Sequence, residues 1–221
     1  MKSYLKDGSL GHKSLNATSL QQITPLKARL TGPGALYNLG NVLALAAGLF
    51  ISLRNAPEHA GAATVIYAHL IGSPDALWLS VSMLLFIISG EFYHRAFQSG
   101  QRPNLVAWGD FISGVAAIAL TVALVLLGNT VLALLGGVLL TMGKLGTAFI
   151  SFFSPNPMPR LDQTLRLTVV ASRAPSIVAL GLTVLPAILG DLPVSEVAIA
   201  CVMIVCFLLW LWADLLLLRP D

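Results

Sequence analysis

The feature that most constrains this chain is a succession of long apolar stretches that occupies residues 35–218. Short breaks rich in glycine, proline and asparagine separate them, and charged residues make up only 10% of the chain. A soluble domain carries about 25% charged residues, so this chain cannot cover a water-facing surface of its size. Because a spanning helix needs about 20 apolar residues, the sequence predicts an all-α integral membrane protein with one membrane domain at residues 35–218.

Six transmembrane helices, arranged as three consecutive hairpins, account for these stretches. The predicted spans are Ala35–Leu53, a second span that starts near Ala76 and has to include Glu91, Leu105–Leu127, Thr130–Phe153, Leu165–Leu189 and Val194–Leu218. Pro175 and Pro186 lie inside the fifth span. Between the first two spans, Ala60–Ile71 is apolar but too short to cross a bilayer. Residues 59–73 are therefore predicted to form a short external helix that lies on the membrane or re-enters it.

The basic residues indicate which side of the membrane each end faces. Ten of them fall on one side: five in the leader, Arg95 and Arg102 in the loop after the second span, Arg160 and Arg166 in the loop before the fifth, and Arg219 in the tail. Arg54 alone falls on the other side. This asymmetry predicts that both termini are cytoplasmic and, in a bacterium, that the protein is a multi-pass protein of the inner (plasma) membrane. Since the basic residues are spread among helix ends, we expect the lipid bilayer and not a nucleic acid as their partner.

The two ends of the chain lie outside the predicted membrane domain. Residues 1–34 form a basic cytoplasmic leader without the features of a signal peptide. Leu20, Ile23, Leu26 and Leu30 recur at helical spacing, so the leader is either disordered or a short helix on the membrane surface. Residues 219–221 form a short cytoplasmic tail.

A small residue followed by a polar or charged one recurs in all six predicted spans, towards the cytoplasmic half of each. The pairs are Gly40-Asn41, Gly90-Glu91, Gly109-Asp110, Gly143-Lys144, Ser172-Arg173 and Ala213-Asp214. Small residues let helices approach closely in lipid, and the adjacent polar group can then reach a neighbouring helix. The six pairs therefore predict one shared polar cluster, with an internal threefold repeat of the hairpin as one explanation.

The ionisable residues within the spans need partners, because an unpaired charge at the bilayer centre costs about 2.5–3.5 kcal/mol on insertion scales. Lys144 lies too deep to reach the membrane surface, so it is predicted to pair with Glu91, Asp110 or Asp214. Arg173 also requires a carboxylate. This pairing leaves one carboxylate over, which protonated His94, a bound cation or its own protonation could balance.

Two interpretations of these residues remain open. In the first, Asn41, Glu91, His94, Asp110, Lys144, Arg173 and Asp214 line a solute or ion path that opens to the cytoplasm. In the second, they form ion pairs that only set the order of the helices. Glu91 and His94 have the Glu-x-x-His spacing of di-iron bundles, but the second motif is missing, so no metal or cofactor is predicted. Tyr93, His94 and Arg95 are interpreted as an interfacial anchor.

Three functions are compatible with this organisation. The first is a small transporter or channel-like protein for a small solute or ion, with a homodimer as one way to complete the path. The alternative is a non-catalytic membrane subunit, regulator or assembly factor that binds a membrane-complex partner. The third is an enzyme acting on a lipid head group with Glu91 or Asp110 as acid or base. The sequence holds no nucleophile elbow or phosphate-binding loop, which makes the enzyme the least favoured of the three.

Overall fold

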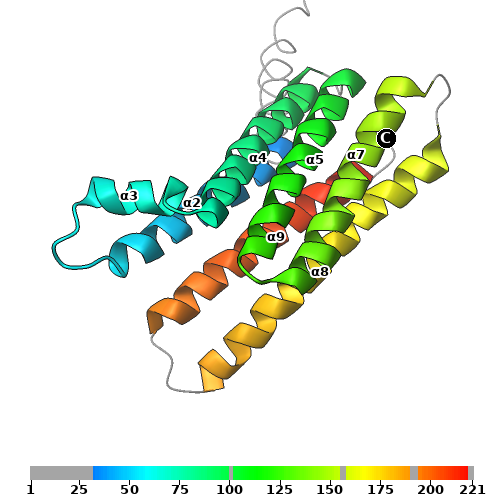
Figure 1. Cartoon of the computed structure of the whole chain (residues 1–221). Coiled ribbons are helices and arrows are strands. Elements are labelled where there is room, and N and C mark those ends of the chain that lie inside the picture. The colour runs from blue at the N-terminus through cyan, green and yellow to red at the C-terminus, as the bar shows by residue number, and fades with distance from the viewer. Residues whose placement is uncertain (1–31, 100–101, 155–157, 190–193, 219–221) are drawn as a thin grey trace, which may run out of the picture.

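The computed structural model describes residues 32–99, 102–154, 158–189 and 194–218, and it contains no strand within these ranges (Figure 1). The predicted all-α class is therefore confirmed for this part of the chain. The predictions for the leader before residue 32 and for the tail at residues 219–221 fall outside the described residues. The helices are α2 (Pro33–Arg54), α3 (Ala62–Ile71), α4 (Pro74–Gln98), α5 (Pro103–Leu126), α6 (Thr130–Leu132), the π-helix η1 (Ala133–Val138), α7 (Leu139–Phe153), α8 (Pro159–Leu189) and α9 (Val194–Leu218).

Five helices in the described part of the chain are long and apolar enough to cross a membrane. They are Pro33–Arg54, Pro74–Gln98, Pro103–Leu126, the continuous helix Thr130–Phe153 made of α6, η1 and α7, and Val197–Leu218. The protein is thus suited to a membrane. The fifth predicted span, residues 165–189, lies within α8, a 31-residue helix that is not among these five.

Proline and glycine set the helix boundaries. Helices α2, α4, α5 and α8 all begin at proline, whose missing N–H costs nothing in the first turn. Gly128, at φ 76°, ends α5 in the left-handed conformation that glycine adopts without strain. Because Pro159 starts α8 six residues before the predicted span, Arg160 and Arg166 lie in a helix; their predicted placement in a loop is wrong. The helix continues through Pro175 and Pro186.

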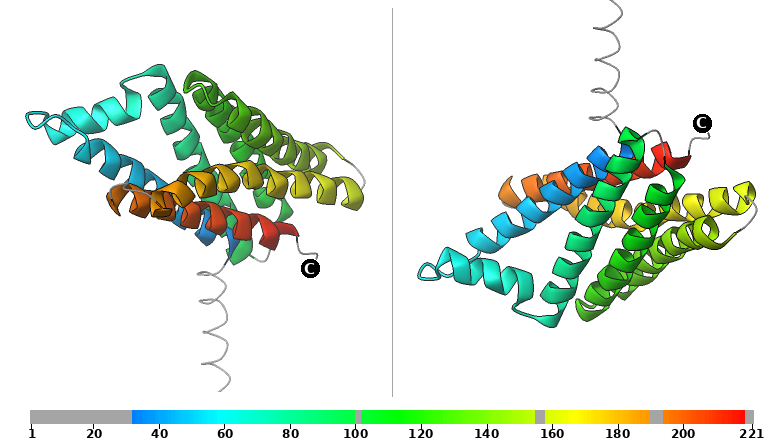
Figure 2. Two further views of the ribbon diagram at one scale, coloured as in Figure 1. Left: turned by 90° about the horizontal axis from the view of Figure 1, so that it is seen from below. Right: turned by 90° about the horizontal axis from the view of Figure 1, so that it is seen from above.

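The long helices form a ring in chain order. Helix α2 contacts α4, α4 contacts α5, α5 contacts α7, α7 contacts α8, α8 contacts α9, and α9 returns to α2 (Figure 2). The two helices of each predicted hairpin are therefore neighbours. Successive helices alternate in direction, so α2, α5 and α8 begin at the end of the ring where α4, α7 and α9 finish.

Helix α3 bridges a place where two neighbouring helices diverge. Near its start, α2 lies so close to α4 that a side chain at Gly34 would stand 2.8 Å from the carbonyl oxygen of Gly90. Towards the other end α2 and α4 separate, and α3 connects them (Figure 2). The Ser52 hydroxyl lies 2.5 Å from His69 Nδ1 and ties α3 to α2. A short helix is thus present inside residues 59–73, and its position relative to the membrane stays a prediction.

Candidate functional site

Close helix packing brings the polar members of the small-polar pairs, with the exception of Glu91, into the ring. Gly40 faces the Trp210 indole, and Gly109 faces the ring of Tyr93. A side chain at Gly143 would stand 2.8 Å from the main-chain oxygen of Leu165 on α8. The helices approach at these glycines, so a polar residue beside each one can reach a neighbouring helix instead of lipid.

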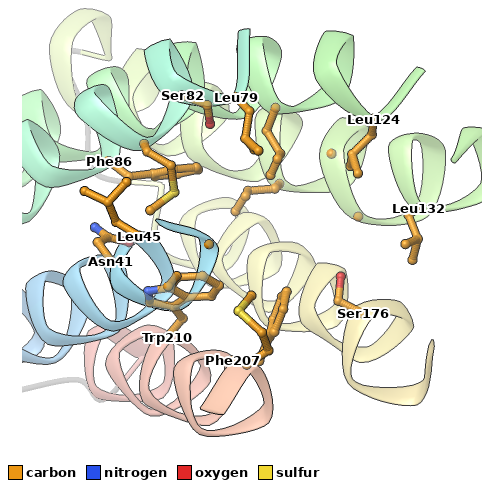
Figure 3. Close-up of a pocket in the computed structure, with 18 of the residues that line it drawn as sticks. Asn41, Leu45, Leu79, Ser82, Phe86, Leu124, Leu132, Ser176, Phe207 and Trp210 are labelled. Atoms are coloured by element: carbon orange, nitrogen blue, oxygen red, sulfur yellow. The ribbon is translucent and has the colours of Figure 1, made fainter. Parts of the chain in front are cut away.

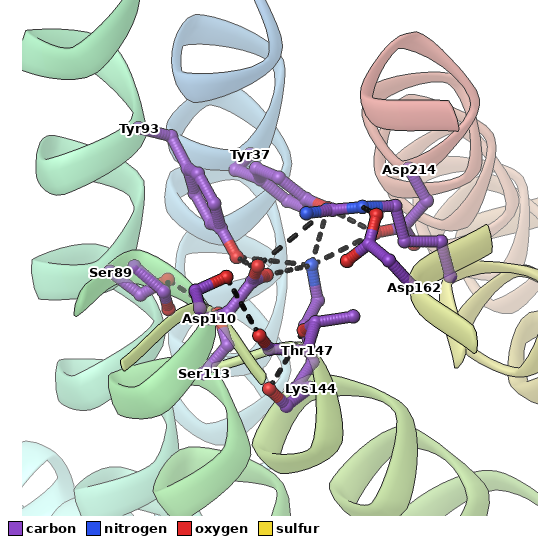
Figure 4. Close-up of polar contacts among 12 residues, drawn as sticks. Tyr37, Ser89, Tyr93, Asp110, Ser113, Lys144, Thr147, Asp162 and Asp214 are labelled. Carbon is purple, nitrogen blue, oxygen red and sulfur yellow. Dashed lines mark hydrogen bonds and ion pairs between the residues drawn. The ribbon is translucent and has the colours of Figure 1, made fainter. Parts of the chain in front are cut away.

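Seven side chains form a buried group that we call the charged network. Its members are Tyr37, Tyr93, Asp110, Lys144, Arg166, Arg173 and Asp214. Each long helix of the ring contributes at least one of them. They meet near the end of the ring where α2, α5 and α8 begin, and we call this the network end (Figure 4).

Lys144 is the centre of the charged network. Its ammonium nitrogen lies 3.2 Å from Asp110 Oδ1 and 3.5 Å from Asp214 Oδ1, and only 3% of the residue is exposed. It also donates to the hydroxyls of Tyr93 at 3.0 Å and Tyr37 at 3.2 Å. The predicted pairing of Lys144 with an acid is therefore present, with two carboxylates in place of one.

The charged network has the same arrangement on each side of Lys144. On one side, Tyr93 donates to Asp110 at 2.5 Å, and Arg166 Nη1 lies 3.6 Å from the second oxygen of that carboxylate. On the other side, Tyr37 donates to Asp214, whose second oxygen accepts from Arg173 Nε at 2.9 Å. The two tyrosine rings stack with their centroids 5.1 Å apart. Each carboxylate is thus held by a tyrosine, an arginine and the shared lysine.

The charges of the charged network balance once Asp162 is included. Asp162 lies at the edge, one-third exposed, and accepts from Arg166 Nε at 2.8 Å. Three carboxylates then face Lys144 and two arginines. The sequence-based pairing left one carboxylate over because it counted Glu91 as a member and placed Arg166 in a loop.

The predicted site residues divide into two groups. Asp110, Lys144, Arg173 and Asp214 come together in the charged network. Glu91, predicted as a partner for Lys144, instead pairs with Arg95 at 2.7 Å on an exposed face of α4, with 46% of its side chain exposed. His94 lies 2.5 Å from Gln98 one turn along the same helix. Asn41 is buried on the wall of a cavity described below.

Sequence reasoning missed Tyr37, Tyr93 and Arg166 as members of the charged network. The interpretation of Tyr93 as an interfacial anchor is wrong, because the residue is fully buried. A signal was present in the register of α4, since Ser82, Ser89 and Tyr93 recur at spacings of seven and four and therefore share one face. That face packs on α5, where the Ser82 hydroxyl donates to the carbonyl oxygen of Ala116 at 2.9 Å.

A cavity of about 580 Å³ lies inside the ring, between the charged network and the opposite end (Figure 3). Its walls are mostly apolar and come from every long helix and from α3. Tyr37 and Arg173 belong to both the cavity wall and the charged network. At the far end the cavity reaches Asn129, an exposed residue in the turn between α5 and α6. The charged network thus closes the ring at one end of the cavity.

Comparison of the chain with protein-family models, with curated proteins and with solved structures finds no match.

Proposed function

We propose that this protein moves a small solute across the membrane, with the cavity as the binding chamber and the charged network as a gate at the cytoplasmic end. The observation that carries the proposal is the cavity inside the ring that ends against the charged network. Water-filled or solute-filled cavities between helices are the usual place for irregular and polar groups at membrane depth. The positive-inside asymmetry of the sequence supports a cytoplasmic position for the network end.

The composition of the charged network suits a gate. Every ring helix supplies a member, so any displacement of one helix breaks at least one hydrogen bond or ion pair. Ion pairs can exchange partners, and Lys144 already contacts two carboxylates at similar distances, 3.2 and 3.5 Å. A group with two alternative partners can support two discrete arrangements of the helices, which alternating access requires.

A second candidate function rests on the burial of the charged network. Asp110, Lys144 and Asp214 are at most 3% exposed, and the lysine pairs with both carboxylates. A structural network of this kind would fix helix order in a non-catalytic membrane subunit and would not open.

Thiol labelling separates the two candidates without knowledge of the solute. In a background with Cys201→Ala and Cys206→Ala, we expect Ser176→Cys on the cavity wall to react with the impermeant reagent 2-sulfonatoethyl methanethiosulfonate from the side opposite the network end. The control is Val178→Cys, two residues along α8 and 58% exposed on the outside of the ring, which we expect to stay unlabelled in lipid.

The gate is tested by adding Tyr37→Phe and Tyr93→Phe, which remove both hydroxyls bound to Lys144 and keep the stacked rings. Transport predicts that the cavity cysteine then becomes reactive from both sides of sealed vesicles. Labelling that stays one-sided favours the structural candidate. A cavity cysteine that reacts from neither side in any background overturns the proposal.

A further inference from the structure

We infer that the cavity binds an organic anion with an apolar body, and that Arg173 holds the anionic group. This inference deepens the proposed function, on which it rests for the role of the cavity. It identifies the class of solute from the chemistry of the cavity wall.

Arg173 presents unused donors to the cavity. Its Nε donates to Asp214 at 2.9 Å, while its two terminal nitrogens have no hydrogen-bond partner among the described residues. The residue is 7% exposed, and it lines the cavity. A guanidinium carries five N–H donors in a fixed fork that matches a carboxylate or phosphate. One edge of the fork is thus held by the protein, which leaves the other edge for a ligand.

The same end of the cavity holds a second donor that lacks an acceptor. The indole nitrogen of Trp210 is buried beside Gly40 and makes no hydrogen bond within the described part of the chain. The guanidinium carbon of Arg173 lies 5.7 Å from the centre of the Trp210 ring, so the two groups are neighbours. An indole N–H can only donate. Both unsatisfied groups at this end therefore call for an acceptor.

The charges on the cavity wall favour an anion over a cation. Arg173 is the only Lys, Arg, Asp or Glu among the described residues that line the cavity. Its partner Asp214 does not line the cavity and is shared with Lys144. The positive pole of this ion pair therefore faces the cavity, where weak screening strengthens its effect on a bound charge.

The remaining walls define the rest of the ligand. Side chains such as Leu45, Phe86, Leu124 and Phe207 surround most of the cavity (Figure 3). A volume of about 580 Å³ lies in the range of pockets that enclose a drug-sized molecule. A sugar or a polyol would leave most of its hydroxyls without partners against these walls. An aromatic or aliphatic carboxylate can pair its anionic group with Arg173 and place its apolar body against these walls.

The test compares three probes of one shape in nanodiscs of zwitterionic lipid. We expect 2-naphthoate to bind at least tenfold more tightly than neutral 2-naphthamide, and the cation 2-naphthylmethylammonium to bind more weakly still, as measured by calorimetry. Phosphatidylglycerol added to the nanodisc distinguishes a free anion from an anionic lipid, because a lipid ligand displaces 2-naphthoate. Equal affinities for the three probes overturn the inference.

Variants locate the binding site. Arg173→Gln is expected to remove the preference for 2-naphthoate over the amide. Met203→Trp fills the cavity from α9 and is expected to abolish binding of both, whereas the control Val205→Trp, at a residue 48% exposed on the outside of the same helix, leaves it unchanged. If Arg173→Gln does not fold, as judged by circular dichroism, the Met203 and Val205 pair still tests the cavity. Equal effects of those two tryptophans overturn the assignment.

Failure of this inference is distinguishable from failure of the proposed function. If Ser176→Cys is labelled from both sides after the gate is loosened but the three naphthalene probes bind equally, the transport proposal stands and the anion assignment is overturned. If 2-naphthoate binds with the expected preference while the labelling stays one-sided, the anion site is supported and transport is overturned.

Discussion

Replacing Lys144 by methionine tests whether the charged network is formed as described. Methionine has nearly the same length and leaves no cavity, so the loss is electrostatic. The substitution removes hydrogen bonds to two tyrosine hydroxyls at 3.0 and 3.2 Å and contacts with two carboxylates at 3.2 and 3.5 Å. It also leaves the charged network, together with Asp162, with one net negative charge.

The structure sets the size of the expected effect. Removing one partner of a buried ion pair costs about 3–5 kcal/mol. Each carboxylate retains an arginine partner, Arg166 at 3.6 Å from Asp110 and Arg173 at 2.9 Å from Asp214. The cost should therefore lie at the low end of this range. We expect Lys144→Met to lower the free energy of unfolding by about 3 kcal/mol, roughly a hundredfold in the unfolding equilibrium constant. Adding Asp110→Asn restores neutrality and should recover about 1–2 kcal/mol.

Steric trapping in bicelles measures these free energies directly. The control is Met142→Ala, two residues earlier on the same helix and 60% exposed on the outside of the ring, for which we expect a change within about 0.5 kcal/mol. A change of less than about 1 kcal/mol in the unfolding free energy of Lys144→Met would refute the reasoning. So would a double variant, Lys144→Met with Asp110→Asn, that is less stable than Lys144→Met alone.

Four further substitutions test separate parts of the structure by thermal unfolding in detergent, and each change given below is in the free energy of unfolding. Tyr93→Phe removes a hydroxyl that bonds a carboxylate at 2.5 Å and an ammonium at 3.0 Å, and should cost about 2–3 kcal/mol; an unchanged melting temperature would contradict those bonds. Gly143→Ala places a methyl group 2.8 Å from a main-chain oxygen and should cost about 1–3 kcal/mol. Gly181→Ala places its methyl group in open space and should stabilise the protein by up to about 1 kcal/mol. A Gly181 variant less stable than the Gly143 variant would contradict the packing of α7 on α8. Glu91→Gln breaks an exposed pair and should cost less than about 1 kcal/mol; a larger loss would indicate that Glu91 belongs to the network.

The candidate site could be predicted in part. Asp110, Lys144, Arg173 and Asp214 were identifiable because an ionisable residue inside an apolar helix needs a partner whatever the fold. Glu91 looked equivalent in sequence, but near the end of α4 it turns outward and pairs with Arg95. Most of that helix is apolar on every face, so only the register of Ser82, Ser89 and Tyr93 distinguishes the face that meets α5 from the face that meets lipid.

The sequence by itself determined the helical class, the positions of the long helices and the requirement for buried ion pairs. These properties follow from local rules: apolar length, proline and glycine at helix ends, and the cost of a charge in lipid. Only the tertiary structure decided that the helices close into a ring, that Tyr37, Tyr93 and Arg166 join Lys144, and that a cavity remains beside Arg173. In a membrane the lipid is as apolar as the helix surfaces, so hydrophobic burial does not select the neighbours of each helix. The selection comes from close contact at glycines and from polar partners on other helices.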